Sequence, residues 1–355
     1  MNQPGPVVLF VIGDCGFWIG DWERRTSGQS EIRNPQSAME EKLHLGGQAV
    51  IEGVMMRSPH AFAVAVRKPS GEIVIAERPW RSLGHRFAFL RWPFFRGSVV
   101  LVESLVNGIQ ALNFSVNQAV PEAEGKPADQ TPEEISPWAL ASTLVLAIGL
   151  ALALFVALPH YLTARSLGLS AQSFAFHLVD GLIKVVFLVL YILGISLLKD
   201  IRRVFMYHGA EHKVIFAFEA GEPLTLEYVT NHSTLHPRCG TAFLLFVVVV
   251  SILLFAALFP WLPRFSQNFW LNNLAQIGVK LPLLFPVAGI SYEFIKLAGK
   301  RPDHPVLRLA AAPGLLLQRL TTREPTPDQI EVAIRAVEAA LYLERNRDGH
   351  ERPVD

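Results

Sequence analysis

Long apolar segments constrain this chain more than any other feature of its sequence. Four of them cover about residues 138–158, 174–198, 242–261 and 277–297. A helix of about 20 apolar residues is long enough to cross the hydrocarbon layer of a membrane. Charged residues make up 18% of the chain, whereas a typical soluble domain has about 25%. We therefore predict a mainly α-helical membrane protein with about four transmembrane helices within residues 137–300.

The distribution of basic residues predicts the orientation of these spans. The connections 161–173 and 262–276 carry one basic residue each, Arg165 and Arg264. Basic residues are more frequent in the N-terminal region, after the second span and in the tail. Because basic loops are retained in the cytoplasm, we place both termini and the segment 204–240 there. The expected location is the cell inner membrane, as a multi-pass protein.

Two segments are expected to lie outside the folded units. The apolar stretch 7–19 is too short for a span, contains Asp14, and follows no basic segment of the kind that opens a secretory signal. We therefore interpret residues 1–38 as a non-native or disordered extension, with the true start at Met39. Residues 121–136 contain acidic residues, prolines and a glycine, which predicts a flexible linker.

Residues 39–120 are expected to form a small cytoplasmic α+β unit that ends in an amphipathic helix. The stretches 61–67 and 72–78 are rich in Val, Ile and Ala, and Pro-Ser-Gly between them predicts a β-hairpin. A third strand or a tight turn is expected at 46–53. Polar and apolar residues occupy opposite sides of a helix over 97–120, which predicts a helix on the membrane surface or against the spans.

Arginine alternates with tryptophan and phenylalanine over residues 78–96. Such a mixture suits RNA binding. Arginine and tryptophan beside apolar segments are more typical of an anchor at the lipid headgroups. We therefore expect membrane lipid as a partner and expect no nucleic acid.

Histidines are concentrated between the second and third spans. The segment 204–240 holds four of the eleven histidines and one of the two cysteines. His208 and His212 are four residues apart, so a helix would place both imidazoles on one face, able to bind one metal ion. With Glu211 they form His-x-x-Glu-His, the inverted form of a zinc-protease signature, in which the glutamate takes a proton from the attacking water.

Further metal ligands are expected from the end of the same segment. His236 and Cys239 are the candidates, with His232 as an alternative. Gly209 weakens a helix, however, and residues 213–219 favour a strand, in which case the histidines need not converge. The structural interpretation is that the histidines bond to neighbouring backbone or to lipid phosphate and that Cys239 is a buried thiol.

Other charged residues in apolar surroundings have simpler interpretations. Asp180 and Lys184 are four residues apart in the second span and are expected to neutralise each other. Glu52 is expected either to pair with Arg57 or to face the histidine segment. Glu293 is expected either to face that segment or to lie at the level of the headgroups.

The tail, residues 301–355, is expected to be cytoplasmic and to contain one amphipathic helix. Thr326 is its predicted N-cap. Its apolar face comprises Ile330, Ala333, Ile334, Val337, Ala340 and Leu341. The apolar patch 313–320 before it is expected to rest on the membrane.

Six stretches together resemble one known family. In chain order they are GGQAVIEGVMMR (46–57), RGSVVLVESLVNG (96–108), YHGAEHK (207–213), HPRCGTAFL (236–244), VAGISYE (287–293) and PGLLLQRLTTREP (313–325). They resemble the YqhQ-like bacterial membrane proteins, a family of unknown function often labelled as predicted metal-dependent enzymes. The resemblance implies this span pattern and gives weight to five residues, but implies no particular reaction. These residues are His208, Glu211, His212, His236 and Cys239.

These observations lead to a first hypothesis and an alternative. The first is a membrane-embedded metal-dependent hydrolase at the cytoplasmic face, with Glu211 as the catalytic base. Its divalent metal, zinc by ligand type, would be held by residues drawn from His208, His212, His236 and Cys239. The alternative is a non-enzymatic scaffold or assembly factor whose N-terminal unit and tail helix bind a cytoplasmic protein. Transport is a weaker third hypothesis, based on the charges in the spans.

Overall fold

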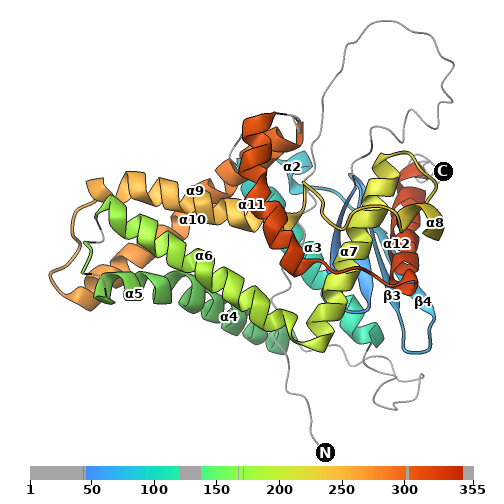
Figure 1. The fold of residues 1–355 in the computed structure, drawn as a ribbon, viewed down its shortest axis with the longest axis horizontal. Helices are drawn as coiled ribbons and strands as arrows, with labels where there is room; N and C mark the ends of the chain where they lie inside the picture. The colour runs from blue at the N-terminus through green and yellow to red at the C-terminus, as the bar shows by residue number, and fades with distance from the viewer. Residues whose placement is uncertain are drawn as a thin grey trace, which may run out of the picture.

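The computed structural model describes residues 43, 45–93, 95–119, 137–166, 168–170, 172–300 and 304–346. The predicted extension 1–38 and the predicted linker 121–136 lie outside these residues. The described residues form a helical bundle joined end to end with a smaller unit built on a sheet (Figure 1). This arrangement confirms a mainly helical protein with a small α+β unit near its N-terminus.

The sheet unit is an antiparallel meander of four strands in the order β1-β2-β3-β4. The strands are β1 (Gly46–Val50), β2 (Gly53–Arg57), β3 (Ala61–Arg67) and β4 (Ile73–Pro79). The predicted hairpin is confirmed as β3 and β4, and Gly71 takes the positive φ of 90° that their turn requires. The region 46–53 contains β1 and the first residue of β2, and a tight turn in which Glu52 has a φ of 52° separates the two strands.

Helices cover both faces of this sheet. Val54, Met56 and Ala65 face α7 (Lys199–Glu219) and α12 (Pro327–Arg345), and all are buried in one core. Met55, Val64 and Val66 point to the other face, where α3 (Phe95–Ala119) packs. Since both faces are covered, β2 and β3 are buried along almost their whole length and are mainly apolar, whereas β4 at the edge of the sheet is partly exposed and ends in polar residues. Two short helices, α2 (Leu83–Arg86) and η1 (Ala88–Arg91), lead from the sheet into α3.

The bundle contains the predicted spans. The first comprises α4 (Pro137–Leu152), the π-helical turn η2 (Ala153–Ala157) and α5 (Leu158–Ser166). The others are α6 (Phe174–Ser196), α9 (Gly240–Leu258) with η3 (Phe259–Trp261), and α10 (Phe269–Lys300). Among the described residues, five helices are long and apolar enough to cross a membrane. The fifth is α3, the helix that we predicted as amphipathic.

Two of these helices have their polar residues inside and their apolar residues outside. On α6, Leu182 and Val186 are 55% and 54% exposed, whereas Lys184 between them is 8% exposed. On α3, Glu103 and Asn107 are buried while Leu105 is exposed. This is the reverse of a soluble helix, which buries its apolar face. It is the pattern of a helix whose outer face contacts lipid.

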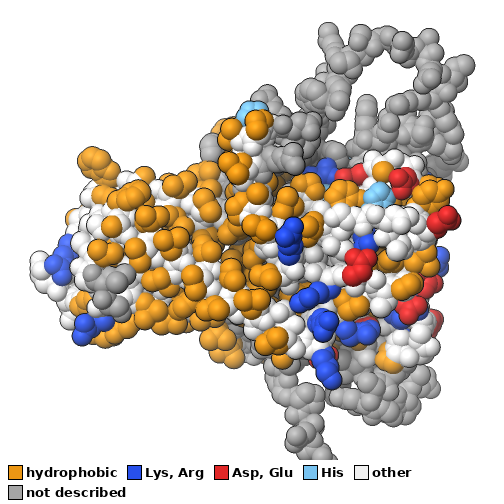
Figure 2. Space-filling view, in the orientation of Figure 1, with side chains coloured by type: hydrophobic (Ala, Val, Ile, Leu, Met, Phe, Trp, Pro, Cys, Tyr) orange, Lys and Arg blue, Asp and Glu red, His pale blue; other side chains and the backbone are white. Residues whose placement is uncertain are grey.

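The surface of the whole molecule has the same organisation. Hydrophobic side chains cover the bundle, and charged side chains gather over the sheet unit and at the far tip (Figure 2). The connections that follow α5 and η3 both lie at that far tip, away from the sheet (Figure 1). An apolar band between two charged ends is what a membrane-spanning domain requires.

The tail returns to both parts of the molecule. The apolar patch 313–320 lies in α11 (Pro305–Thr321), which packs against α6 and α9, while its contact with lipid stays a prediction. Thr326 caps α12 as predicted, in a reciprocal capping box with Gln329. The predicted apolar face of α12 is buried against the sheet and α7. The scaffold hypothesis therefore loses this face as a docking surface.

Two acidic residues have partners that the sequence did not predict. Glu52 accepts hydrogen bonds from Arg203 at the start of α7, which ties the β1–β2 turn to that helix. Glu293 near the end of α10 pairs with Arg96 at the start of α3. Neither carboxylate belongs to the histidine cluster described below.

Candidate metal centre

The candidate site is built on α7, which begins at Lys199, shortly after α6 ends at Ser196. This helix carries Tyr207 to Glu219 without a break, so the strand predicted at 213–219 is wrong. Val214, Ile215 and Ala217 are buried in the core shared with the sheet and α12. That packing outweighs the local preference of β-branched residues for a strand. The helix places His208 and His212 on one face, as the spacing required.

Gly209 is needed for close packing and does not break the helix. A Cβ atom here would lie 2.0 Å from the carbonyl oxygen of Arg323. The backbone after α11 passes over α7 at this point, and Arg323 N–H donates to the Phe205 carbonyl at 2.9 Å. The close approach brings the end of α11 against the candidate site.

Three donor side chains converge at the junction of α7 and α9. The ligand atoms of His208, His212 and Cys239 all lie within 4.8 Å of one another, and all three residues are buried. The Cys239 Sγ atom lies 3.4 Å from the Nε2 atom of His208. Tetrahedral zinc, with Zn–S near 2.3 Å and Zn–N near 2.0 Å, would place these two atoms about 3.5 Å apart. The pair therefore has a spacing that metal ligation requires.

The backbone fixes the orientation of both imidazoles. His208 Nδ1 lies 2.8 Å from the Thr321 carbonyl oxygen, and His212 Nδ1 lies 2.5 Å from the Thr234 carbonyl oxygen. A carbonyl only accepts hydrogen bonds, so each Nδ1 carries the proton and each Nε2 presents a lone pair. Metal-binding histidines are commonly held in this way.

Cys239 is placed by the start of α9. It is the N-cap of that helix, and its Sγ accepts a hydrogen bond from the Thr241 backbone N–H at 3.4 Å. The Thr241 hydroxyl lies 2.9 Å from the same sulfur. The positive end of the helix dipole favours negative charge on the sulfur, which is the form that binds metals.

The other two predicted histidine ligands take different positions. The ring of His236 lies 5.6 Å from that of His212, centre to centre, but its Nε2 points to Glu219 at 3.6 Å. Its backbone N–H and carbonyl are both bonded to the Gln318 side chain. His232 bonds to Glu222 at 2.9 Å. Neither residue belongs to the three-donor group found among the described residues.

Glu211 is buried on the side of α7 that faces the sheet. A Cβ added to Gly47 in β1 would fall 2.6 Å from its Cδ and Oε1 atoms, so the carboxylate lies directly on that glycine. It is next to His212 in the chain but outside the three-donor group. Its role as a base stays a prediction.

A neighbouring tyrosine shows how this side of α7 is held. The hydroxyl of Tyr207 donates to Glu52 at 3.3 Å. Burial, followed by the charge of Glu52, raises the pKa of Tyr207, so its hydroxyl stays protonated. The bond thus links α7 to the β1–β2 turn.

Several parts of the site carried no sequence signal. The Thr234 and Thr321 carbonyls are backbone groups, which any residue could supply. Gln318, which holds His236, lies 82 residues away from it in the chain. Such partners emerge only when distant segments are brought together.

Fold and site together define a class: a membrane protein with a His₂Cys cluster buried where its helical bundle meets a four-stranded sheet unit. The chain belongs to the family described as "Protein of unknown function (DUF1385)", whose model matches residues 92–343. The "Uncharacterized protein YqhQ" of Bacillus subtilis (strain 168) is 34% identical over 313 residues, which are 87% of this chain and 95% of that protein. These matches confirm the YqhQ-like resemblance. No solved structure matches the chain.

Proposed function

We propose that this protein is a membrane-bound metal-dependent hydrolase. His208, His212 and Cys239 would hold a divalent ion, and Glu211 would act as the general base. The observation that carries the proposal is the orientation of the two histidines. Each Nδ1 is bound to a backbone carbonyl, which makes Nε2 the ligand atom of each ring, and the two histidines and Cys239 offer ligand atoms within 4.8 Å of one another.

The donor set favours zinc. Two imidazole nitrogens and one thiolate suit this borderline-soft ion better than magnesium or calcium, which prefer oxygen ligands. Three protein ligands are also the usual number in a catalytic zinc site, because the fourth position is left for water or substrate. A bound zinc ion would supply Lewis acidity to a scissile carbonyl or phosphoryl group.

Glu211 would then accept the proton of the attacking water. Glu211 is buried, carries a carboxylate and follows the turn of α7 that bears His208. In the His-x-x-Glu-His arrangement this residue takes the proton of the attacking water. We expect it to do so here without ligating the ion, since it lies outside the three-donor group.

The substrate class is inferred from the position of the site. Cys239 begins α9, a candidate span, and α7 follows α6, another candidate span. The cluster therefore lies where the apolar bundle gives way to the charged sheet unit. A lipid headgroup or a membrane-embedded peptide would reach this level. From the distribution of basic loops we further propose that this end of the bundle faces the cytoplasm.

Metal analysis of the purified full chain in detergent tests the proposal. We expect about one zinc per chain in the wild type, and loss of that zinc in a His208→Ala, His212→Ala double variant. His232→Ala is the matched control, because His232 bonds to Glu222 outside the cluster and should leave the zinc content unchanged. Glu211→Gln should also retain zinc.

Two results would overturn the metal centre. One is intact protein without a metal ion after purification without chelators. The other is full zinc content in the double variant. Either result would favour the scaffold hypothesis. In that case the bonds from His208 and His212 to backbone carbonyls would serve only to hold α7 against the end of α11 and the segment before α9.

A further inference from the structure

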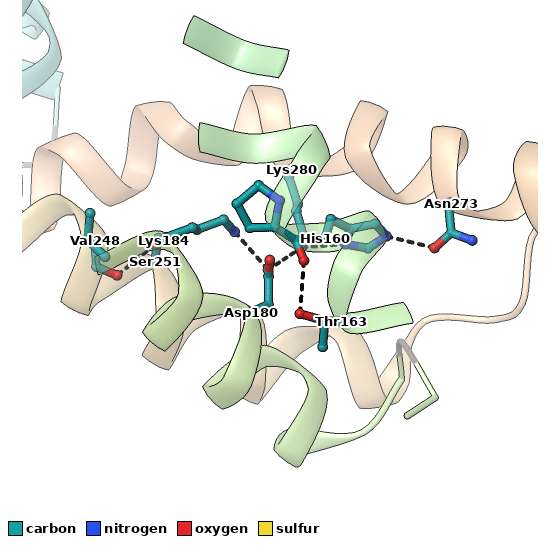
Figure 3. A network of polar contacts seen from close by, with 9 residues as sticks. His160, Thr163, Asp180, Lys184, Val248, Ser251, Asn273 and Lys280 are labelled. Carbon is teal, nitrogen blue, oxygen red and sulfur yellow. Dashed lines mark hydrogen bonds and ion pairs between the residues drawn. The ribbon is translucent and has the colours of Figure 1, made fainter. Parts of the chain in front are cut away.

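A second polar cluster lies inside the helical bundle, far from the histidine site. It brings together His160 on α5, Asp180 and Lys184 on α6, and Lys280 on α10 (Figure 3). All four side chains are buried. Charged residues inside a span are unfavourable in lipid and commonly mark a functional site.

The carboxylate of Asp180 joins the two lysines. Its Oδ2 atom accepts from Lys184 Nζ at 2.7 Å, as the four-residue spacing predicted, and from Lys280 Nζ at 2.9 Å. The two ammonium groups therefore lie close together, because both contact one oxygen. Lys280 Nζ also lies 3.0 Å from His160 Nδ1.

The protonation of His160 follows from its neighbours. Asn273 donates its amide N–H to the Phe269 carbonyl at 2.7 Å, so its Oδ1 faces the imidazole. His160 Nε2 lies 2.8 Å from that oxygen and must donate to it. A neutral imidazole with its proton on Nε2 has an acceptor at Nδ1, which receives the bond from Lys280. His160 therefore contributes no charge.

The cluster as a whole carries a surplus positive charge. Two ammonium groups and one carboxylate leave a net charge of +1. The rings of Phe176, Phe255 and Phe259 lie 5.6–5.7 Å from Lys280 Nζ, a spacing that stabilises an ammonium ion. His177, one turn before Asp180, packs on the ring of Phe259 and adds a titratable group to the same region. The phenyl rings carry no charge, so they do not offset the surplus of the two lysines over Asp180.

Hydrogen-bond donors are also in surplus. Each lysine has three N–H donors, of which Lys184 uses one and Lys280 two in the bonds above. Gln276 lies on α10 between Asn273 and Lys280, near both by helical spacing, and is only 1% exposed. Neither polar atom of its side chain has a hydrogen-bond partner among the residues that the structure describes. A buried amide normally has a hydrogen-bond partner, and a bound ion would supply one here.

We propose that this cluster binds a small monovalent anion, a halide or a carboxylate. The ammonium groups of Lys184 and Lys280 and the amide N–H of Gln276 would hold it. An anion cancels the surplus charge and accepts the spare N–H donors, whereas a cation would add to the charge. Because none of these three ligands belongs to the histidine and cysteine group, the proposal is independent of the metal centre.

Thermal unfolding of the purified full chain in detergent tests this site. Sodium chloride or sodium acetate is titrated against sodium gluconate, a bulky anion, at constant ionic strength. Binding to the folded state should raise the Tm of the wild type as chloride or acetate increases. A response to only one of the two anions would support the proposal and assign the class of ligand.

Variants separate a specific site from a general salt effect. Lys184→Met leaves the neutral Asp180–Lys280 pair and should abolish the rise in Tm. Gln276→Leu keeps every charge and should reduce the rise, which decides the question if Lys184→Met does not fold. Lys199→Met, at the exposed start of α7, is the control and should respond like the wild type. A wild type that does not respond, or equal responses in all four proteins, would overturn the proposal.

Discussion

The close approach of the Arg323 backbone to Gly209 leads to a specific prediction for a larger residue at position 209. In Gly209→Ala the new Cβ would lie 2.0 Å from the Arg323 carbonyl oxygen, and contacts below 3.0 Å are essentially never seen. The backbone at Arg323 must therefore move away from α7 by at least about 1 Å. Such a shift would take two bonds beyond hydrogen-bond distance, from Arg323 to Phe205 and from His208 to Thr321.

The magnitude follows from three contributions. Overpacking typically destabilises by about 1–3 kcal/mol. Each lost hydrogen bond adds about 0.5–1.5 kcal/mol, and the better helix propensity of alanine offsets about 0.5–1 kcal/mol. We expect the free energy of unfolding to fall by about 2–4 kcal/mol. The zinc content should fall as well, because His208 would lose the carbonyl that orients it.

The measurement is denaturant unfolding of the purified chain in detergent, followed by metal analysis. Gly278→Ala in α10 is the matched control, since a Cβ there meets nothing within 4 Å. It should leave stability and zinc content unchanged or slightly improve stability. If Gly209→Ala is as stable as Gly278→Ala and keeps its zinc, the close approach of 321–323 to α7 is not what positions His208.

Three further predictions concern the spans and the tail. Leu182→Arg places a charge on the lipid-facing side of α6 and should disfavour insertion by about 2.5–3.5 kcal/mol; an unchanged carbonate-resistant membrane fraction would show that this face does not contact lipid. Thr326→Ala removes the capping box of α12 and should lower stability by about 1 kcal/mol in denaturant unfolding; a smaller loss than in Thr225→Ala, whose side chain makes no cap bond, would contradict this. Alkaline phosphatase fused after the last residue should be inactive if the tail is cytoplasmic, and an active fusion would refute that orientation.

The features that depend only on residues close together in the sequence were predictable from it. The length and hydropathy of each span are local, and the structure reproduces the four apolar segments within its long helices. The hairpin of β3 and β4 follows from one turn, and the cap at Thr326 from one motif. The pairing of Asp180 with Lys184 needed only a helix.

Features that depend on packing were predicted incompletely. The residues of 213–219 suit a strand in isolation, and only their burial against the sheet and α12 makes them helical. The four-residue spacing placed His208 and His212 together, but Cys239 joins them only through the path of α9. Lys280 reaches Asp180 across 100 residues of sequence, which no local pattern indicates.

The packing of α12 on the sheet has a consequence for biogenesis. Arg67 at the end of β3 bonds to the Asp328 carbonyl of α12, 261 residues later in the chain, and the two elements share one core. The strands are synthesised first, but the face of the sheet that α12 covers stays incompletely buried until the later spans and the tail have been synthesised. During that interval the exposed apolar surface of the sheet is prone to aggregation, so we expect chaperones to bind it. A chain truncated before α12 would leave this apolar face of the sheet uncovered, and we expect it to aggregate or to be degraded.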